Sequence, residues 1–362
     1  MRRLRFFLVF GLCLHSFSKP HAQKRLQQTT FTAQGYFGSF LTHLPKAQYL
    51  RDSYSQFGEL SISRQTDGRH DWQVANRFPE VGLALFFGNT GSRKYMGHMA
   101  GVFPFVAWPL YKTKNVTSRF RAGAGIGFVE KPYNKISNHK SVLIGNYGNA
   151  YIHFLWQNEV RLFSNIHATA GLGFSHFSNG SSTLPNLGLN IPALSIGLRY
   201  SGTHDQPIIK RKLDSLDKKS SLSLFTAVGL KQFPWIESQR YLVNTVQFEW
   251  ARRFRNYGRY SGGAVLFYDR ALEVNPAGIL DQKRKGNKLQ AGIYGGYEHL
   301  LGRLSVPVQL GVYVYNNDIY SALFQQVGFR YRIASQWTAQ LAMKTHSGKA
   351  DFVHLGVGYQ IR

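Results

Sequence analysis

Hydrophobic and polar residues alternate along most of the chain, in segments of about ten residues separated by polar turns. Residues 303–316 show the pattern most clearly, with apolar side chains at Leu304, Val306, Val308, Leu310, Val312 and Val314. Residues 119–128 and 353–362 repeat it, with glycine or polar residues at the intervening positions. Because successive side chains of a strand point to opposite faces, each segment predicts a β-strand with one apolar and one polar face. No run of about 18 apolar residues follows residue 22, so no transmembrane helix is predicted.

The predicted strands fall into two groups of eight. The first group begins near residues 29, 57, 80, 95, 118, 147, 165 and 189, and the second near 220, 240, 258, 289, 303, 319, 336 and 351. Residues 202–219 between the groups are polar and basic, which is typical of a linker. The two groups also end alike, since ATAGLGFSHFSNG resembles TAQLAMKTHSGKA. We interpret residues 23–201 and 220–362 as two copies of one eight-stranded unit.

Strands with one apolar face fit two architectures. A soluble periplasmic sandwich would turn that face inward, whereas an outer-membrane barrel would turn it outward into lipid. Aromatic residues near the strand ends are typical of the second, and they are Trp108, Tyr111, Trp156, Tyr200, Trp250, Tyr331 and Trp337. The pattern therefore favours an all-β fold, a transmembrane antiparallel β-barrel in the outer membrane. Two eight-stranded barrels and one barrel of about sixteen strands both remain open, and the long linker favours two.

The N-terminus predicts export from the cytoplasm. Residues 1–22 combine Arg2, Arg3 and Arg5 with a short apolar stretch and a plausible cleavage end before Gln23, as in a secretory signal peptide. The single cysteine, Cys13, lies inside this segment. Cleavage would therefore leave a chain without a disulfide, a Cys-ligated zinc site or an iron–sulfur cluster.

The predicted export changes the interpretation of the net charge. The chain has 44 Lys+Arg against 18 Asp+Glu, a formal net charge of +26, which by itself suggests nucleic acid or an anionic membrane surface as a partner. Four of the basic residues lie in the predicted signal segment, and an exported protein does not meet nucleic acid in its ordinary surroundings. An anionic lipid surface is the expected partner, and nucleic acid is not.

One segment combines polar residues with the lipid-facing side of two predicted strands. His176 and Ser178 have the same parity as Ala168, Ala170, Leu172 and Phe174, which form the apolar face of the seventh strand. Asn190 has the parity of Leu194, Ile196, Leu198 and Tyr200 in the eighth. Side chains two residues apart lie about 6.6–6.8 Å apart along one face of a strand, so they can interact. A polar group on a lipid-facing wall is costly, which makes this trio a candidate functional site.

The same segment resembles the PagL-type outer-membrane lipid A 3-O-deacylases and the related acyloxyacyl hydrolases. The resemblance rests on His176-Phe-Ser178-Asn179 at the end of the seventh strand, followed by Pro185-Asn-Leu-Gly188 before the eighth, and it extends over roughly residues 29–201. It implies a Ser–His hydrolase that removes an ester-linked acyl chain from lipid A of lipopolysaccharide.

The resemblance also assigns roles to individual residues. It implies that Ser178 is the nucleophile and His176 its general base, with Asn190 at the position where the family has an acid. An asparagine can orient an imidazole but cannot stabilise its cation by charge. Position and resemblance make the backbone N–H groups of Asn179 and Gly180 the candidate oxyanion donors. We expect Asn186 and Gly188 to form a tight turn.

The second unit lacks this trio, because His346 and Ser347 are adjacent and point to opposite faces. Lys344, His346 and His354 are expected to fill the barrel interior. The other histidines show no metal-ligand spacing, so neither a metal nor another cofactor is predicted. Two other functions remain open: a non-catalytic pore or surface-binding barrel, with a site that has decayed at Asn190, and a phospholipase or acyltransferase acting on other outer-leaflet lipids.

Overall fold

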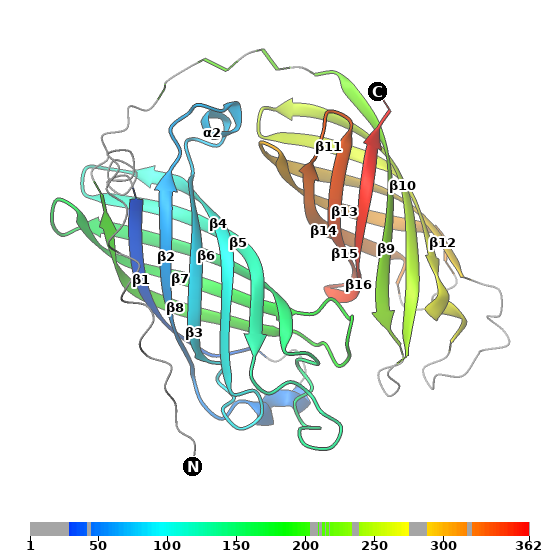
Figure 1. Ribbon diagram of the computed structural model, residues 1–362, viewed down its shortest axis with the longest axis horizontal. Helices are drawn as coiled ribbons and strands as arrows, with labels where there is room; N and C mark the ends of the chain where they lie inside the picture. Colours follow the sequence, from blue (N-terminus) through cyan, green and yellow to red (C-terminus); the bar gives the residue numbers. More distant parts are fainter. Residues whose placement is uncertain are drawn as a thin grey trace, which may run out of the picture.

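The computed structural model describes residues 29–361 except for 42–44, 203–208, 210, 211, 214, 217, 234–238, 275–287 and 317–320. The proposed signal peptide, residues 1–22, lies outside the described residues. The protein consists of two closed antiparallel barrels of eight strands each (Figure 1). The two-barrel alternative is therefore confirmed, and both the single sixteen-stranded barrel and the soluble sandwich are wrong.

The N-terminal barrel closes through pairing of its first and last strands, with Thr30 opposite Ser201. Its strands are β1 (Thr29–Gly38), β2 (Ser55–Gln65), β3 (Glu80–Asn89), β4 (His98–Lys112), β5 (Val116–Val129), β6 (Gly148–Arg161), β7 (Ile166–Ser178) and β8 (Leu189–Ser201). Two short helices lie in its connections, η1 (Pro45–Leu50) and α2 (Asp71–Ala75). We call the end where β7 joins β8 the β7–β8 end, and the opposite end, where Thr29 and Ser201 lie, the termini end.

The C-terminal barrel closes in the same way, with Val353 opposite Leu230. Its strands are β9 (Ser220–Gln232), β10 (Arg240–Arg255), β11 (Gly258–Asp269), β12 (Leu289–Leu301), β13 (Leu304–Tyr315), β14 (Leu323–Arg332), β15 (Trp337–His346) and β16 (Lys349–Gln360), and the helix η2 (Arg270–Glu273) follows β11. The expected strand near residue 319 begins at Leu323, and the one near 95 begins at His98. The remaining expected starts lie within two residues of the observed ones.

Charged pairs fill the interior of both barrels. In the N-terminal barrel, Arg121 Nη1 lies 2.6 Å from Glu59 Oε1. In the C-terminal barrel, Arg330 Nη1 lies 2.7 Å from Glu249 and 2.9 Å from Glu298, and all three side chains are buried. An eight-stranded barrel is just wide enough for side chains to fill it. The interior therefore disfavours the pore hypothesis, which requires an aqueous channel.

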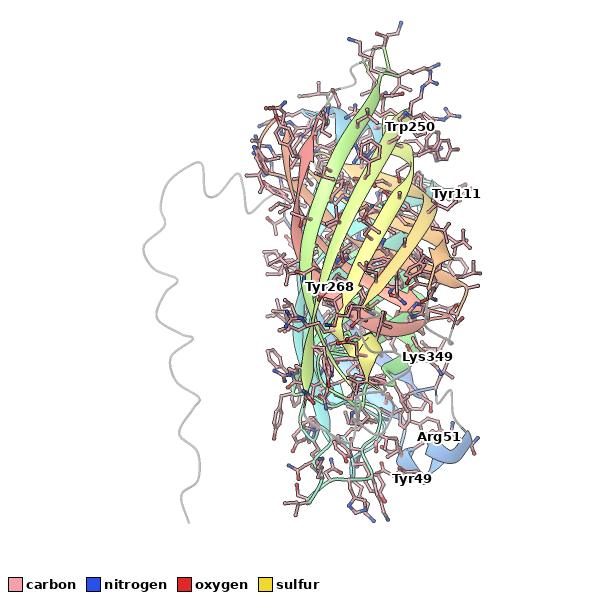
Figure 2. All side chains as sticks on the ribbon, turned by 90° about the vertical axis from the view of Figure 1, so that its right-hand side faces the viewer. Tyr49, Arg51, Tyr111, Trp250, Tyr268 and Lys349 are labelled. Carbon is pink, nitrogen blue, oxygen red and sulfur yellow. The ribbon has the colours of Figure 1, made fainter. Side chains whose placement is uncertain are left out.

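Apolar side chains cover the outside of both barrels, as the alternation predicts. Exposed fractions reach 72% at Ile196 and 66% at Leu60 in the N-terminal barrel, and 66% at Val314 in the C-terminal barrel. Figure 2 shows two exposed aromatic residues, Tyr111 and Trp250, near the end of the molecule opposite to Tyr49. An apolar band flanked by aromatic residues is the exterior of a membrane-spanning barrel. Within the described part of the chain, no helix is long and apolar enough to cross a membrane.

The two barrels touch at both ends (Figure 1). At the termini end, α2 of the N-terminal barrel lies against the turn between β12 and β13. There Asn76 Nδ2 donates to Leu300 O at 3.1 Å, and His299 Nε2 donates to Asn76 Oδ1 at 2.9 Å. The second contact involves the loop between β7 and β8, which carries the candidate site.

Candidate active site

His176 and Asn190 meet on the outer side of the wall formed by β7 and β8, and Ser178 ends β7 on the same side, with Asn186 and Gly180 as its hydrogen-bond partners. His176 and Asn190 are opposite each other in the register of the two strands, and His176 Nδ1 lies 2.6 Å from Asn190 Oδ1. The next residue of β7, Phe177, is fully buried inside the barrel, whereas Leu172 and Leu194 on the outward side are more than half exposed. The structure therefore places the trio on the apolar exterior, where the residue parity predicts it.

The loop after β7 covers most of Ser178 and Asn190, whereas His176 remains partly exposed on the outer wall. Ser178 and Asn190 are each only 7% exposed. Residues beyond β1 reach the site from the other side, since Leu41 N donates to Asn190 O at 2.8 Å. Gly188 has a φ of +78°, and a Cβ at this position would lie 3.0 Å from His176 Cε1. The glycine therefore permits both the turn and the close approach of the imidazole.

Asn186 contacts the proposed nucleophile directly. Its Nδ2 donates to Ser178 Oγ at 2.9 Å, and its Oδ1 accepts from the backbone N–H of Asn179 at 3.1 Å. Sequence reasoning assigned Asn186 a turn role only, and it missed this contact. The available signal was the position of Asn186 in the Pro-Asn-x-Gly motif shortly after Ser178.

The two candidate oxyanion donors differ in their surroundings. The Gly180 N–H is directed at Ser178 Oγ, at 3.2 Å, whereas the Asn179 N–H is engaged by Asn186. Gly180 has a φ of +63°, in the left-handed region that glycine adopts without steric cost. Two N–H donors, the Gly180 backbone and the Asn186 amide, therefore surround the Ser178 hydroxyl.

An apolar surface continues from the trio along the outer wall. Two overlapping grooves of about 590 Å³ each run across β8, β1, β2 and β3. Glycines stand in their lining where larger side chains would fill the space. The residues that line both grooves are Gly35, Gly58, Phe87 and Ile196. Leu194, which lies four residues after Asn190, also lines one groove. An acyl chain near the trio could lie against this surface.

The loops at the β7–β8 end are basic and held together. Asp52 accepts from the backbone N–H groups of Arg93 and Lys94 at 2.8 and 2.9 Å. Partial burial acts to raise the pKa of Asp52, but these hydrogen bonds outweigh it, so the pKa lies below its usual value. The exposed basic side chains of these loops are Arg51, which Figure 2 shows beside Tyr49, together with Arg93, Lys94, Lys131, Lys135 and Lys140.

The C-terminal barrel has no corresponding trio at its described positions. His346 Nε2 lies 2.7 Å from the hydroxyl of Tyr313, and Lys344 and His354 are buried inside the barrel. These three residues fill the interior, as expected from their parity. Among the described residues, no group of three His, Cys, Asp or Glu side chains is placed to bind a metal ion.

Comparison with known families matches both halves of the chain. Residues 56–199 match lipid A 3-O-deacylase (PagL), and residues 220–362 match the acyloxyacyl hydrolase C-terminal domain. The chain belongs to the PagL family of outer-membrane β-barrels. Membership indicates a hydrolase acting on ester bonds of lipid A, located in the outer membrane.

The comparisons with curated proteins and with solved structures do not extend the family assignment. The comparison with curated proteins gives no match. Among solved structures, two mutants of the Rhodopseudomonas blastica porin align at 11% and 9% identity with TM-scores of 0.19 and 0.17, over 92% of this chain and 100% of the porin. At these TM-scores the likeness carries no argument about this chain.

Proposed function

We propose that this protein removes an ester-linked acyl chain from lipid A by a Ser–His mechanism, with Ser178 as nucleophile and His176 as general base. One observation carries the proposal: the outward wall holds a His176–Asn190 hydrogen bond beside a serine whose hydroxyl receives two N–H donors. Such a group on a lipid-facing surface is costly unless the substrate is found there. The family supports lipid A as that substrate.

The contact with Asn190 sets the tautomer of His176. An amide Oδ1 can only accept a hydrogen bond, so the proton of the neutral imidazole lies on Nδ1 and donates to Asn190. In the proposed mechanism, the lone pair on Nε2 takes the proton of Ser178. Asn190 thus performs the orienting part of a triad acid's role, while the stabilising negative charge is missing.

The reaction proceeds in two steps. As Nε2 of His176 takes the hydroxyl proton, Ser178 Oγ attacks the ester carbonyl carbon, and the carbonyl oxygen becomes an oxyanion that the Gly180 N–H and the Asn186 amide stabilise. The imidazolium then protonates the leaving sugar oxygen, and the carbon–oxygen bond breaks to leave an acyl-Ser178. Water attacks this ester with His176 again as base, which releases the fatty acid and restores the serine.

The position of the site suits outer-leaflet lipid. Both barrels begin and end at the termini end. If that end is periplasmic, as in outer-membrane barrels with short periplasmic turns, the trio lies at the level of the outer leaflet. The basic loops would contact the phosphates of lipid A, and the glycine-lined grooves would contact its acyl chains. Export by a signal peptide, residues 1–22, is part of this proposal.

The test is the acyl composition of lipid A. Cells that produce the protein should contain lipid A lighter by one acyl chain in mass spectrometry, and cells producing Ser178→Ala should not. Ser195→Ala is the matched control, because Ser195 is buried inside the barrel on β8 and no hydrogen bond of its hydroxyl is found among the described residues. Unchanged lipid A with the unsubstituted protein would refute the deacylase function. Release of fatty acid from purified phospholipid instead of lipid A would establish the phospholipase alternative.

A further inference from the structure

Residues 180–184 of the loop between β7 and β8 contact the C-terminal barrel. Gln232 N donates to Ser181 O at 3.1 Å, and Leu184 N donates to Gln232 Oε1 at 3.0 Å. Ser181 Oγ donates to Ala350 O at 2.7 Å. The two barrels therefore exchange hydrogen bonds within three residues of Ser178.

These partners belong to the closing seam of the C-terminal barrel. Gln232 is the last residue of β9 and Ala350 the second of β16, and these two strands pair to close the barrel. Val353 of β16 packs on the same loop, since a Cβ at Gly180 would lie only 2.2 Å from Val353 Cγ2. The exterior of one barrel thus lies directly against the residue whose N–H is directed at Ser178.

The loop conformation depends on such support. Gly180 and Ser181 both have a φ of +63°, so two consecutive residues lie in the left-handed region, and the second carries a side chain. This conformation is unfavourable for a non-glycine residue and persists where surrounding contacts hold it. For Ser181 those contacts come from Gln232 and Ala350, one on each strand of the seam.

We propose that the C-terminal barrel positions the oxyanion donor of the N-terminal barrel, with Gln232 as the principal positioning residue. The proposal rests on the proposed function, because it assigns a purpose to the loop of that same site. The backbone N–H of Gln232 donates to Ser181 O, its side-chain oxygen accepts from the Leu184 N–H, and together these bonds keep the Gly180 N–H directed at Ser178. Gln232→Ala removes the side-chain bond and leaves the backbone bond.

The first test is kinetic and uses the full chain in detergent with lipid A. Gln232→Ala should lower kcat by about ten- to hundredfold with KM nearly unchanged, because a shift of a donor by about 1 Å costs this much. Gln232→Glu keeps an acceptor oxygen for the Leu184 N–H and should restore most of kcat. Asn76→Ala is the matched control, because it removes the hydrogen bonds between the barrels at the termini end, and it should leave kcat within about twofold. Equal losses in Gln232→Ala and Asn76→Ala would overturn the proposal.

The second test uses the contact between Gly180 and Val353. Gly180→Ala places a methyl group against Val353 and should lower kcat. Val353→Ala removes the atom that this methyl group meets, so the double variant should recover part of the loss, while Val353→Ala alone should have little effect. A double variant as slow as Gly180→Ala would show that backbone conformation alone explains the loss, and it would contradict the role of this contact.

A third measurement does not depend on activity. Hydrogen–deuterium exchange of residues 179–184 should be faster in Gln232→Ala than in the unsubstituted protein, and unchanged in Asn76→Ala. If Ser178→Ala abolishes activity while Gln232→Ala changes neither kcat nor exchange, the positioning proposal is wrong and the proposed function stands. If the unsubstituted protein does not act on lipid A, the proposed function is wrong, and the exchange result still decides whether Gln232 holds the loop.

Discussion

His176 Nδ1 and Asn190 Oδ1 are joined by a hydrogen bond of 2.6 Å between directly opposite residues of β7 and β8. The strand register alone brings the two side chains together, so their contact does not depend on a mobile loop. In the proposed mechanism, this amide oxygen stands where the resemblance to the family implies an acid. Asn190 would then orient the proposed base, without the charge that stabilises its cation.

Asn190→Asp should therefore accelerate the reaction. The carboxylate has the same size as the amide and would add an attraction of roughly 1–4 kcal/mol to the imidazolium formed during attack. We expect kcat to rise about tenfold or more. Asn190→Leu, which has a similar shape without hydrogen-bonding groups, should lower kcat. An Asn190→Asp protein slower than the unsubstituted one would contradict the role of Asn190 as the orienting residue.

Asn186→Asp should separate the turn role of this residue from its role as a donor. The carboxylate keeps the acceptor for the Asn179 N–H but loses the Nδ2 donor to Ser178, and it places a negative charge beside the developing oxyanion. We expect kcat on lipid A to fall about a hundredfold or more, as on loss of an oxyanion donor. Circular dichroism should show an unchanged fold. Near-normal activity would mean that Asn186 serves the turn alone.

Arg330→Met should destabilise the C-terminal barrel. It removes the cation between Glu249 and Glu298 and leaves two buried carboxylates without it, at a cost of about 3–5 kcal/mol. The temperature at which the purified protein unfolds in detergent should fall. Arg332→Met, on an exposed position of the same strand, is the control and should change this temperature little. Equal unfolding temperatures for the two variants would show that the buried cluster does not stabilise the barrel.

The purified protein should show no stepwise conductance in planar lipid bilayers. Side chains fill the interior of eight-stranded barrels, and here buried arginine–glutamate pairs cross both interiors. A sixteen-stranded porin measured under the same conditions provides the positive control. Reproducible channel openings would restore the pore hypothesis and would require that the interior ion pairs separate.

The positions of the strands and the face on which the trio lies follow from local patterns in the sequence. Alternation with a period of two is a local property, so it located strand starts such as Thr29, Ser220 and Leu289 and placed His176 and Ser178 on the outward side. The duplication of the eight-stranded unit and the His-x-Ser-Asn motif could also be identified from the sequence alone. Where glycine and polar turn residues blurred the alternation, as before His98, the predicted start was less accurate.

The closure of the strands into barrels and the surroundings of Ser178 depend on contacts between distant parts of the chain. Closure depends on pairing between distant strands, Thr30 with Ser201 and Val353 with Leu230, and identical alternation would serve one large barrel equally well. The contact of Asn186 with Ser178 depends on the path of the loop, which a period of two does not encode. The hydrogen bonds of Gln232 join residues of different barrels, so they arise only once both barrels have closed and packed together.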